Sequence, residues 1–531
     1  MSSNLVTEPA IETKIRKMQQ RVRWQHPQIA AQGIDQTRLV IEDGGADDDA
    51  FSFLVLGDSG TGRHRSNSPQ REVAEQLLTH ADEARFTLHT GDVVYLVGSC
   101  EYYQANFIKP YREWLVGGDD YHQIAYDAMT FKRPILPVLG NHDYYDLPFW
   151  LGLISGLTAP LRYALRSYLD LDVKWHGSYQ GDAFARAFLD YLKAVPEAHL
   201  DEHLVTHYAS TVEDDAKTNA TRSVPNGNRT RALTYRPGQF TRLPNRYYSF
   251  RYGGIDFFAL DSNTFNQPLR RTDTANNRQV LQQQRQRLEV AKADLIRQVS
   301  LGLFNANDED QEHLTEKIQS IDEELNDIEK QLDSRNAPEV DTEQLDWLRD
   351  RLIASWQNPA VRGRILFFHH PPYVTEATKW PQGQTLAVRH HLRRVLDAVA
   401  AEVSEVAQGR PLLDLVLNGH AHCLDYLRTA DTGHGDAHIP WVVCGGSGYS
   451  LRRQRPEGPI LTETLDGTAR TVAESHLYLG RVGKGSQLKR PYTGLKVEVS
   501  PGNPPKLTLT PLVAEKLDGK WQRYEMAGIE L

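Results

Sequence analysis

The sequence has few cysteines, no long apolar run and no excess of positive charge. Three cysteines in 531 residues, Cys100, Cys423 and Cys444, make neither a disulfide framework nor a CxxC zinc site, and they favour reduced thiols in the cytoplasm. No stretch reaches the roughly 18 apolar residues of a transmembrane helix, and residues 1–24 lack the apolar core of a secretory signal. A formal net charge of −9 disfavours a general nucleic-acid binder. The sequence therefore predicts a cytoplasmic protein without a membrane or nucleic-acid partner.

Short apolar runs recur along the chain and alternate with helix-like segments. The runs lie at 51–57, 85–90, 134–139, 255–260, 364–368 and 412–417. Each is typical of a buried strand that leads into a loop. Helices are predicted between several of them, for example at 70–80 and 343–355, and Asp341 can cap the latter with Gln344 at the third position. This alternation predicts an α/β fold.

Two long insertions and an N-terminal extension interrupt the alternation. Residues 1–45 are polar and mixed, with a basic helix predicted at 12–24, and we expect one catalytic domain over 46–531. The first insertion, 148–240, contains helical pieces and a polar loop, and long loops of this kind often form lids or substrate regions. The Gly-, Pro- and Thr-rich end, 440–531, is predicted to add strands to the main sandwich.

The second insertion, 275–338, has the pattern of a helical hairpin arm. Heptad-like spacing joins Leu314, Ile318, Ile321, Leu325, Ile328 and Leu332, and upstream Leu281, Leu288 and Leu295. A turn-forming break at 302–310 separates the two groups, which predicts an antiparallel coiled-coil hairpin. The arm either packs on its own domain or mediates self-association or partner binding, and the sequence does not separate these alternatives.

Five motifs with metal-binding side chains each follow a predicted strand. They are GDSG at 57–60, GDVVY at 91–95, GNHD at 140–143, FFHH at 367–370 and GHAH at 419–422. The candidate ligands are Asp58, Asp92, Tyr95, Asn141, His369, His420 and His422. Mixed nitrogen and oxygen ligands suit zinc, iron or manganese better than calcium or magnesium. Seven ligands exceed the needs of one ion, whereas a bridging carboxylate can join two ions about 3.5–4 Å apart. One such motif means little, but five in this order predict a two-metal site.

The order of these motifs resembles that of the calcineurin-like metallophosphoesterases, over roughly 51–145, 245–265 and 344–450. Within that superfamily, GDxG and GDxxY together are similar to the purple acid phosphatases. The segments GHAHCLDYL and WVVCGGSG look like those of their small, mammalian-type members. Most other members carry a histidine two residues after the first aspartate, where this chain has Gly60. The resemblance implies a metallophosphoesterase β-sandwich flanked by helices, in four α/β/β/α layers.

The resemblance also implies a metal scheme in which Asp92 bridges two ions. An Fe(III) ion would take Asp58, Asp92, Tyr95 and His422. A second ion, Fe(II), Zn or Mn, would take Asp92, Asn141, His369 and His420. A phenol has a reference pKa near 10, so a trivalent ion suits its ionisation at low pH. Tyr95 could instead be a core tyrosine beside a divalent site.

The mechanism implied by the resemblance uses a hydroxide generated at the metal pair to attack phosphorus. His142 would bind a phosphate oxygen or protonate the leaving alcohol, or it would only orient Asn141 or Asp58. Small members have a further active-site histidine nine positions after His369, where this chain has Thr378. Asp143, His370 and Lys379 are the candidate supporting residues around the ligands.

These observations favour a phosphomonoesterase of the purple acid phosphatase type, with two metal ions. The substrate would be a phosphorylated small molecule or a phosphoprotein. A phosphodiesterase or nucleotide hydrolase on the same scaffold is the alternative, because the pocket walls expected from 148–240 decide between them. A non-catalytic scaffold that uses the coiled arm is a more distant alternative, because all seven candidate ligands are present.

Overall fold

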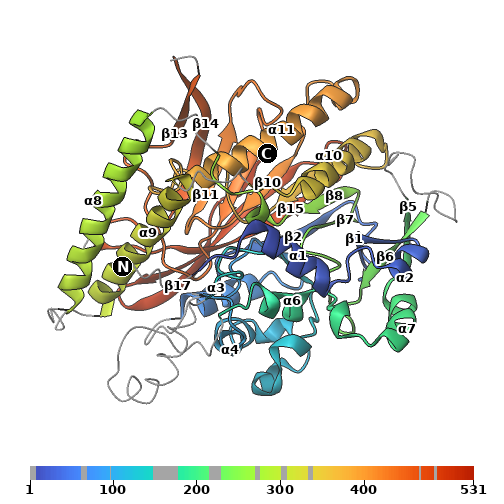
Figure 1. Ribbon diagram of the computed structural model, residues 1–531. Coiled ribbons are helices and arrows are strands. Elements are labelled where there is room, and N and C mark those ends of the chain that lie inside the picture. The colour runs from blue at the N-terminus through green and yellow to red at the C-terminus, as the bar shows by residue number, and fades with distance from the viewer. Residues whose placement is uncertain are drawn as a thin grey trace.

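The computed structural model shows a mixed α/β fold with two sheets and several helices (Figure 1). It describes residues 7–60, 68–95, 97–146, 177–213, 229–269, 275–300, 308–332, 339–465, 468–483 and 487–531. The helices are α1 (Ile11–Arg21), α2 (Pro27–Ala31), α3 (Pro69–Leu78), α4 (Cys100–Tyr103), α6 (Asp182–Phe188), α7 (Glu197–His207), α8 (Ala275–Ser300), α9 (Asp308–Leu332), α10 (Thr342–Gln357) and α11 (Gly383–Ala407).

Within the described residues the larger sheet has eleven strands and the smaller has seven. The larger runs β13 (Ile460–Leu465), β14 (Thr468–Leu479), β11 (Leu424–Thr429), β12 (Pro440–Cys444), β10 (Leu415–Asn418), β9 (Gly363–Phe367), β8 (Ile255–Ala259), β7 (Tyr248–Tyr252), β1 (Ile34–Ile41), β6 (Arg229–Tyr235) and β5 (Ser210–Glu213). The smaller runs β17 (Lys520–Glu525), β16 (Leu507–Leu517), β15 (Tyr492–Val499), β2 (Phe51–Leu56), β3 (Ala84–His89) and β4 (Ile135–Pro137), with β18 (Ile529–Glu530) beside β16.

The six strands predicted from apolar runs are β2, β3, β4, β8, β9 and β10, and all are confirmed. The two predicted helices are confirmed as α3 and α10. Asp341 caps α10 as predicted, because its carboxylate accepts the Gln344 backbone N–H. The Gln344 side chain does not complete a capping box, since it bonds the backbone of Asp261.

Aromatic side chains fill the core between the two sheets. Phe53 of β2 and Phe86 of β3 stack at 5.3 Å, and each lies about edge-on to Phe257 of β8, at 5.5 and 5.4 Å. Such pairs contribute beyond their apolar burial, by about 0.5–1.5 kcal/mol each. Because these rings come from both sheets, they fix how the strand ends of one sheet face those of the other.

Helices cover the outer faces of the sheets. Leu348 of α10 and Leu392 of α11 belong to a second core, together with Leu366 of β9 and Val416 of β10. Helix α3 packs on β15 and β16 of the smaller sheet and buries Val73. The strands that carry the motifs are therefore buried on both faces, which explains their unbroken apolar runs.

The N-terminal residues are part of the main architecture. Strand β1 lies inside the larger sheet and runs parallel to both β6 and β7. Helix α1, which overlaps the basic segment 12–24, buries Lys14 and Arg21. The ammonium group of Lys14 donates to the Asn263 carbonyl at 3.1 Å, and Arg21 donates to Asp182 at 3.1 Å. The helix is thus tied to the body by its cations.

Helices α8 and α9 occupy the 275–338 insertion and lie side by side (Figure 1). Lys292 of α8 pairs with Asp322 of α9, and Arg285 pairs with Glu329, so the two helices run antiparallel. Leu325 and Ile328 of the predicted seam are buried. Residues 302–307 of the expected break lie outside the described residues. So do residues 148–176 of the first insertion and most of its expected polar loop.

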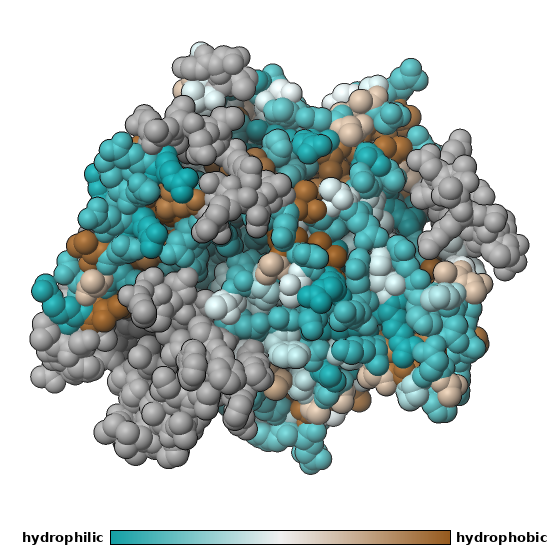
Figure 2. Space-filling view, viewed as in Figure 1, coloured by the Kyte–Doolittle hydropathy of each residue, from teal (hydrophilic) through white to brown (hydrophobic). Residues whose placement is uncertain are grey.

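Polar side chains dominate the side of the molecule shown in Figure 2, with apolar ones scattered among them. None of the described helices combines the length and the apolar character that a membrane span requires.

Helix α9 is held on the body by a carboxylate whose loss can be measured. Glu323 lies 2.5 Å from the Lys379 ammonium group. Burial alone would raise the pKa of Glu323, but Lys379 and Arg452 outweigh burial and lower this pKa from 4.5 to about 2. We expect Glu323→Gln to lower the free energy of unfolding on the order of 2 kcal/mol at pH 7. The pKa of Glu323 is lower in the folded protein than in the unfolded chain. The contribution of its ion pair to stability is therefore complete above pH 4.5 and is lost as the pH falls toward about 2.

Urea unfolding of wild type and Glu323→Gln at pH 7 and pH 3 tests this expectation, and the difference between the two proteins should shrink at the lower pH. Glu289→Gln is the matched control, because Glu289 pairs with Arg285 on the exposed side of α8 and such pairs contribute little. A difference that is independent of pH would show that the ion pair is not the cause.

Candidate metal centre

The five motifs meet where strand ends of both sheets face each other. Strands β2, β3 and β4 are parallel neighbours in the smaller sheet, and β9 and β10 are parallel neighbours in the larger one. Each motif begins within three residues of the carboxyl end of its strand. The seven candidate ligands are brought together and buried: Asp58, Asp92, Tyr95, Asn141, His369, His420 and His422.

Each carboxylate is anchored through one oxygen and presents the other to the centre. Asp58 Oδ2 accepts the His420 backbone N–H at 2.8 Å, and Asp92 Oδ1 accepts the His142 backbone N–H at 2.8 Å. Asp58 Oδ1 and Asp92 Oδ2 then lie 2.9 and 2.7 Å from the Tyr95 hydroxyl. The backbone therefore sets which oxygens face the centre.

Two histidines are oriented in the same way, by backbone carbonyl groups. His369 Nδ1 donates to Thr90 O at 2.9 Å, and His422 Nδ1 donates to Ser450 O at 3.0 Å. In a neutral imidazole this leaves the lone pair of Nε2 facing the centre. His369 Nε2 lies 2.9 Å from Asn141 Oδ1, and His422 Nε2 lies 3.1 Å from the Tyr95 hydroxyl.

The centre holds more hydrogen-bond acceptors than protons. Tyr95 can donate one proton, yet its oxygen lies within 3.1 Å of two carboxylates and His422 Nε2. Asn141 Oδ1 lies 2.9 Å from both His369 Nε2 and His420 Nδ1, and each of these nitrogens can donate to it when protonated. The lone pairs around Tyr95 repel each other unless cations lie between them. The donor set therefore fits bound metal ions.

The spacing of the donors fits metal ions as well. Ligands at about 2.0–2.3 Å from one ion lie about 3 Å apart, and the neighbouring donors here are separated by 2.7–3.6 Å. Asp58, Asp92 and His369 form one group that could hold an ion, and His369, His370 and His420 form another. His370 fits less well, because its Nδ1 lies 2.8 Å from Ser262 Oγ and its Nε2 lies 3.2 Å from the Asn266 amide nitrogen.

The electrostatics of the protein alone also favour a cation here. Burial raises the pKa of the Asp58 carboxyl well above its usual range. Burial, together with Asp58 and Asp92, raises the pKa of Tyr95 well above 10. Burial alone would lower the pKa of His369, but the Asp92 carboxylate outweighs burial and raises this pKa to about 9. The proton on His369 then balances only one of the buried negative charges. Metal ions would balance the rest, because they favour the ionised carboxylates and phenolate.

Three of the candidate ligands have unusual backbone angles. Asp58, Asp92 and His420 have φ values of 52°, 54° and 67°, in the left-handed region. Residues with a Cβ rarely adopt it, at a cost of about 1–3 kcal/mol each. The backbone turn that orients each of these three side chains is thus formed by the metal-binding residue itself, together with the glycine before it.

Gly60 lies against the backbone of the GDVVY loop, where there is no room for a side chain. A Cβ at Gly60 would lie 2.6 Å from the Tyr95 backbone nitrogen and 2.8 Å from the Val94 Cα. A Cβ at Gly140 would similarly lie 2.1 Å from Asp92 Oδ1. The GDVVY loop can therefore approach the first motif only because position 60 has no side chain.

The two residues that follow Asn141 differ in position. The His142 ring packs on Tyr95 at 4.3 Å and on Tyr145 at 4.8 Å, and it is 9% exposed. The Asp143 carboxylate is buried and accepts the backbone N–H groups of Gly140, Asp92 and Val93 at 2.9–3.2 Å. His142 thus adjoins the centre, whereas Asp143 joins the second and third motifs.

The loop after His369 places a lysine at the centre. Thr378, at the position of the additional histidine, turns away and donates to Glu376 at 2.8 Å. Lys379 Nζ instead lies 3.1 Å from His420 Nε2 and pairs with Glu323 of α9. Gln384, in the first turn of α11, also lies 3.1 Å from His420 Nε2.

Sequence reasoning missed several neighbours of the centre. The Tyr449 ring stacks on Tyr95 at 4.0 Å, and its backbone N–H donates to Asp58 O. Ser447 accepts the Gly57 backbone N–H at 3.1 Å. The Gly-rich run before them was the available signal. Nothing local marked Gln384 or Glu323, because both come from distant helices.

Comparisons with known proteins show only distant likeness. No protein-family model and no curated protein matches the sequence. Similar solved structures include the purple acid phosphatase PPD1 from yellow lupin (Lupinus luteus) seeds, with a TM-score of 0.39 and 13% identity over 91% of this chain and 53% of that one. Another is GAP50, the anchor in the inner membrane complex of Plasmodium, with a TM-score of 0.36 and 10% identity over 90% of this chain and 89% of that one. This chain spans about half the length of the lupin protein.

The close approach at Gly60 leads to a testable expectation. Gly60→Ala should push the Tyr95 loop away from Asp58, with a loss of about 1–3 kcal/mol in the free energy of unfolding and a lower metal content per chain. Urea unfolding and elemental analysis after dialysis measure the two effects. Unchanged metal content at wild-type stability would show that the loop accommodates the methyl group.

Proposed function

We propose that the protein is a phosphoester hydrolase with two metal ions, on a four-layer α/β/β/α scaffold, and that phosphomonoesters are its substrates. The observation that carries this proposal is the convergence of two carboxylates, a phenol, an amide oxygen and three imidazoles, with more lone pairs than protons, at facing strand ends. Paired ions supply Lewis acidity and a nucleophile at neutral pH for in-line displacement at phosphorus.

The proposed ligands divide between two positions that share Asp92. Asp58 Oδ1, Tyr95 and His422 Nε2 would hold the first ion, which we propose is Fe(III). Asn141 Oδ1, His369 Nε2 and His420 Nδ1 would hold the second, which we propose is Fe(II), Zn or Mn. The distances between the donor atoms support this division, since Tyr95 is close to the first group and Asn141 to the second.

Side chains beside the proposed ligands would handle the substrate. Water adds to phosphorus, the P–O bond to the alcohol breaks, and the leaving oxygen takes a proton, giving the alcohol and inorganic phosphate. His142, which packs on Tyr95, would bind a phosphate oxygen or supply that proton. Lys379, beside His420, would stabilise negative charge on the phosphoryl oxygens.

Hydrolysis of p-nitrophenyl phosphate and bis(p-nitrophenyl) phosphate tests the proposal. The chain reconstituted with iron, zinc or manganese should cleave the monoester faster. Asp92→Asn should lower kcat/KM by about 10²–10³-fold or more and reduce the content of both ions, because it removes the shared ligand. Asp346→Asn, on the exposed side of α10, is the control and should retain activity and metal. A metal-loaded chain that cleaves neither ester would disprove the proposal.

The proposed Fe(III) assignment has its own test. Protein reconstituted with iron should absorb broadly in the visible range through the Tyr95 phenolate, and Tyr95→Phe should lose this band. Tyr449→Phe is the matched control. It keeps the ring that stacks on Tyr95 and removes a hydroxyl group that is not a proposed ligand, so it should retain the band. A colourless, fully active enzyme with only zinc or manganese would rule out Fe(III) and leave the two-metal proposal intact.

A further inference from the structure

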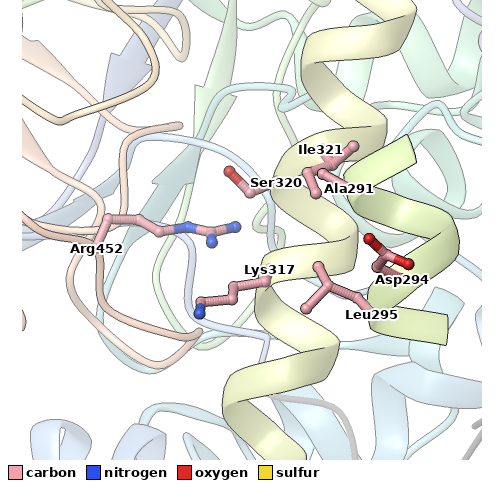
Figure 3. Close-up of a pocket in the computed structure, with 7 residues that line it drawn as sticks. All are labelled: Ala291, Asp294, Leu295, Lys317, Ser320, Ile321 and Arg452. Carbon is pink, nitrogen blue, oxygen red and sulfur yellow. The ribbon is translucent and has the colours of Figure 1, made fainter. Parts of the chain in front are cut away.

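The helical arm holds the start of α11 through the later turns of α9. Its earlier turns face the body across a pocket of about 400 Å³, where Figure 3 shows Ser320 of α9 on one side and Arg452 of the body on the other. Further along α9, the Asp327 carboxylate accepts the backbone N–H groups of Gly383 and Gln384 at 2.8 and 2.9 Å. These two residues begin α11, so their position depends on the arm.

Two side chains from different elements contact the same nitrogen of His420. The Gln384 side chain and the Lys379 ammonium group each lie 3.1 Å from His420 Nε2. The other ring nitrogen, Nδ1, lies 2.9 Å from Asn141 Oδ1 and is the proposed metal-binding atom. The groups around Nε2 therefore decide which ring nitrogen carries the proton and which presents a lone pair.

The hydrogen bonds of His420 must run in opposite directions with and without a bound ion. Without one, Nδ1–H can donate to Asn141 Oδ1 while Nε2 accepts from Gln384 and Lys379. When Nδ1 binds an ion, a neutral imidazole carries its proton on Nε2, and this N–H needs an acceptor. Lys379 cannot be that acceptor, because an ammonium group only donates. Lys379 keeps a partner of its own in Glu323.

The Gln384 carboxamide can become the acceptor by a half-turn about its last bond, which exchanges its oxygen and nitrogen. Oε1 would then face the Nε2–H of His420. The neighbouring Gln382 supports this arrangement. Its Oε1 lies 2.6 Å from Gln384 Nε2, and its own buried Nε2 has no hydrogen-bond partner among the described residues. If both carboxamides turn, that nitrogen donates to Gln384 Oε1 and gains a partner.

We propose that Gln384 is a positioning residue for the second metal ion. Its Oε1 accepts the Nε2–H of His420, which keeps the lone pair on Nδ1 for the ion. Gln382 completes the chain of hydrogen bonds, and Asp327 of the arm holds the backbone from which Gln384 projects. This inference rests on the two-metal centre of the proposed function. The arm thereby contributes to one metal position without supplying a ligand.

Titration of the metal-free full chain with Zn²⁺ against a chromophoric chelator tests this role by giving two dissociation constants. Gln384→Leu removes the acceptor and should weaken one of them about 10–100-fold, the usual effect of losing the hydrogen-bond partner of a metal-binding histidine. The other constant should be unchanged, because His420 belongs to one position only. Gln384→Glu retains an acceptor oxygen and should bind both ions at least as tightly as wild type. Gln283→Leu, on an exposed part of α8, is the matched control and should change neither constant.

A double-mutant cycle separates positioning from a general effect on folding. In a chain that already carries His420→Ala, Gln384→Leu should weaken Zn²⁺ binding no further, because the two substitutions act on one metal position. Asp327→Ala should weaken the same constant as Gln384→Leu, since it frees the start of α11, whereas Asp346→Ala on the exposed side of α10 should weaken neither. Additive losses in the double mutant, or equal losses in Gln384→Leu and Gln384→Glu, would overturn the positioning role.

Release of p-nitrophenol from p-nitrophenyl phosphate by the same samples separates this inference from the proposed function. Hydrolysis by wild type together with unchanged Zn²⁺ affinity in Gln384→Leu would overturn the positioning role and retain the hydrolase. One weakened constant in Gln384→Leu, combined with no release of p-nitrophenol by wild type, would retain the positioning role and overturn the hydrolase.

Discussion

Lone-pair repulsion inside one buried volume is the constraint on which the rest of the structure depends. Tyr95 faces two carboxylates and an imidazole nitrogen, and Asn141 faces two imidazole nitrogens. An arrangement of this kind is unfavourable for the protein alone, because buried charge without a counter-charge costs several kcal/mol. It persists only where the backbone holds each side chain in place. Backbone amides and carbonyls therefore occupy the outward atoms of Asp58, Asp92, His369 and His422.

The two-sheet architecture makes this arrangement achievable. Strands of the smaller sheet provide the oxygen ligands, and strands of the larger sheet provide the imidazoles. The aromatic core between the sheets, including Phe53, Phe86 and Phe257, fixes their separation, so the two ligand types meet at their facing ends. Left-handed backbone angles at Asp58, Asp92 and His420 complete the geometry at a local energetic cost. Strain of this kind is tolerated where the surrounding packing is strong.

Much of the centre could be predicted from sequence, because its signals are local. An apolar run, a glycine and a donor side chain follow one another within a few residues, and this pattern placed Asp58, Asp92 and His420 at strand ends. Gln384 and Glu323 carry no such mark. Their places depend on which distant segments pack together, and a single sequence does not reveal that packing. Strand β1 was missed for a similar reason, since its residues are polar and mixed and its pairing with β6 joins segments far apart in the chain.

Heptad spacing predicted the arm's two helices but not the face that docks. The seam residues Leu325 and Ile328 are buried, yet polar residues make the specific contacts with the body. Of the two alternatives that the spacing left open, packing on the body is observed for α9.

The cap that Asp327 provides for α11 has a consequence for how this chain can be shortened. Helix α11 cannot satisfy its first backbone N–H groups from its own sequence alone, because Gln382 at its N-cap makes no capping bond and the carboxylate comes from α9, more than fifty residues earlier. The insertion is therefore not a removable module. Trimming the arm would expose the start of α11, unseat Gln384 beside His420 and take the counter-ion from Lys379 in a single step. A segment that looks like an addition in the sequence is thus a structural support of the candidate metal centre.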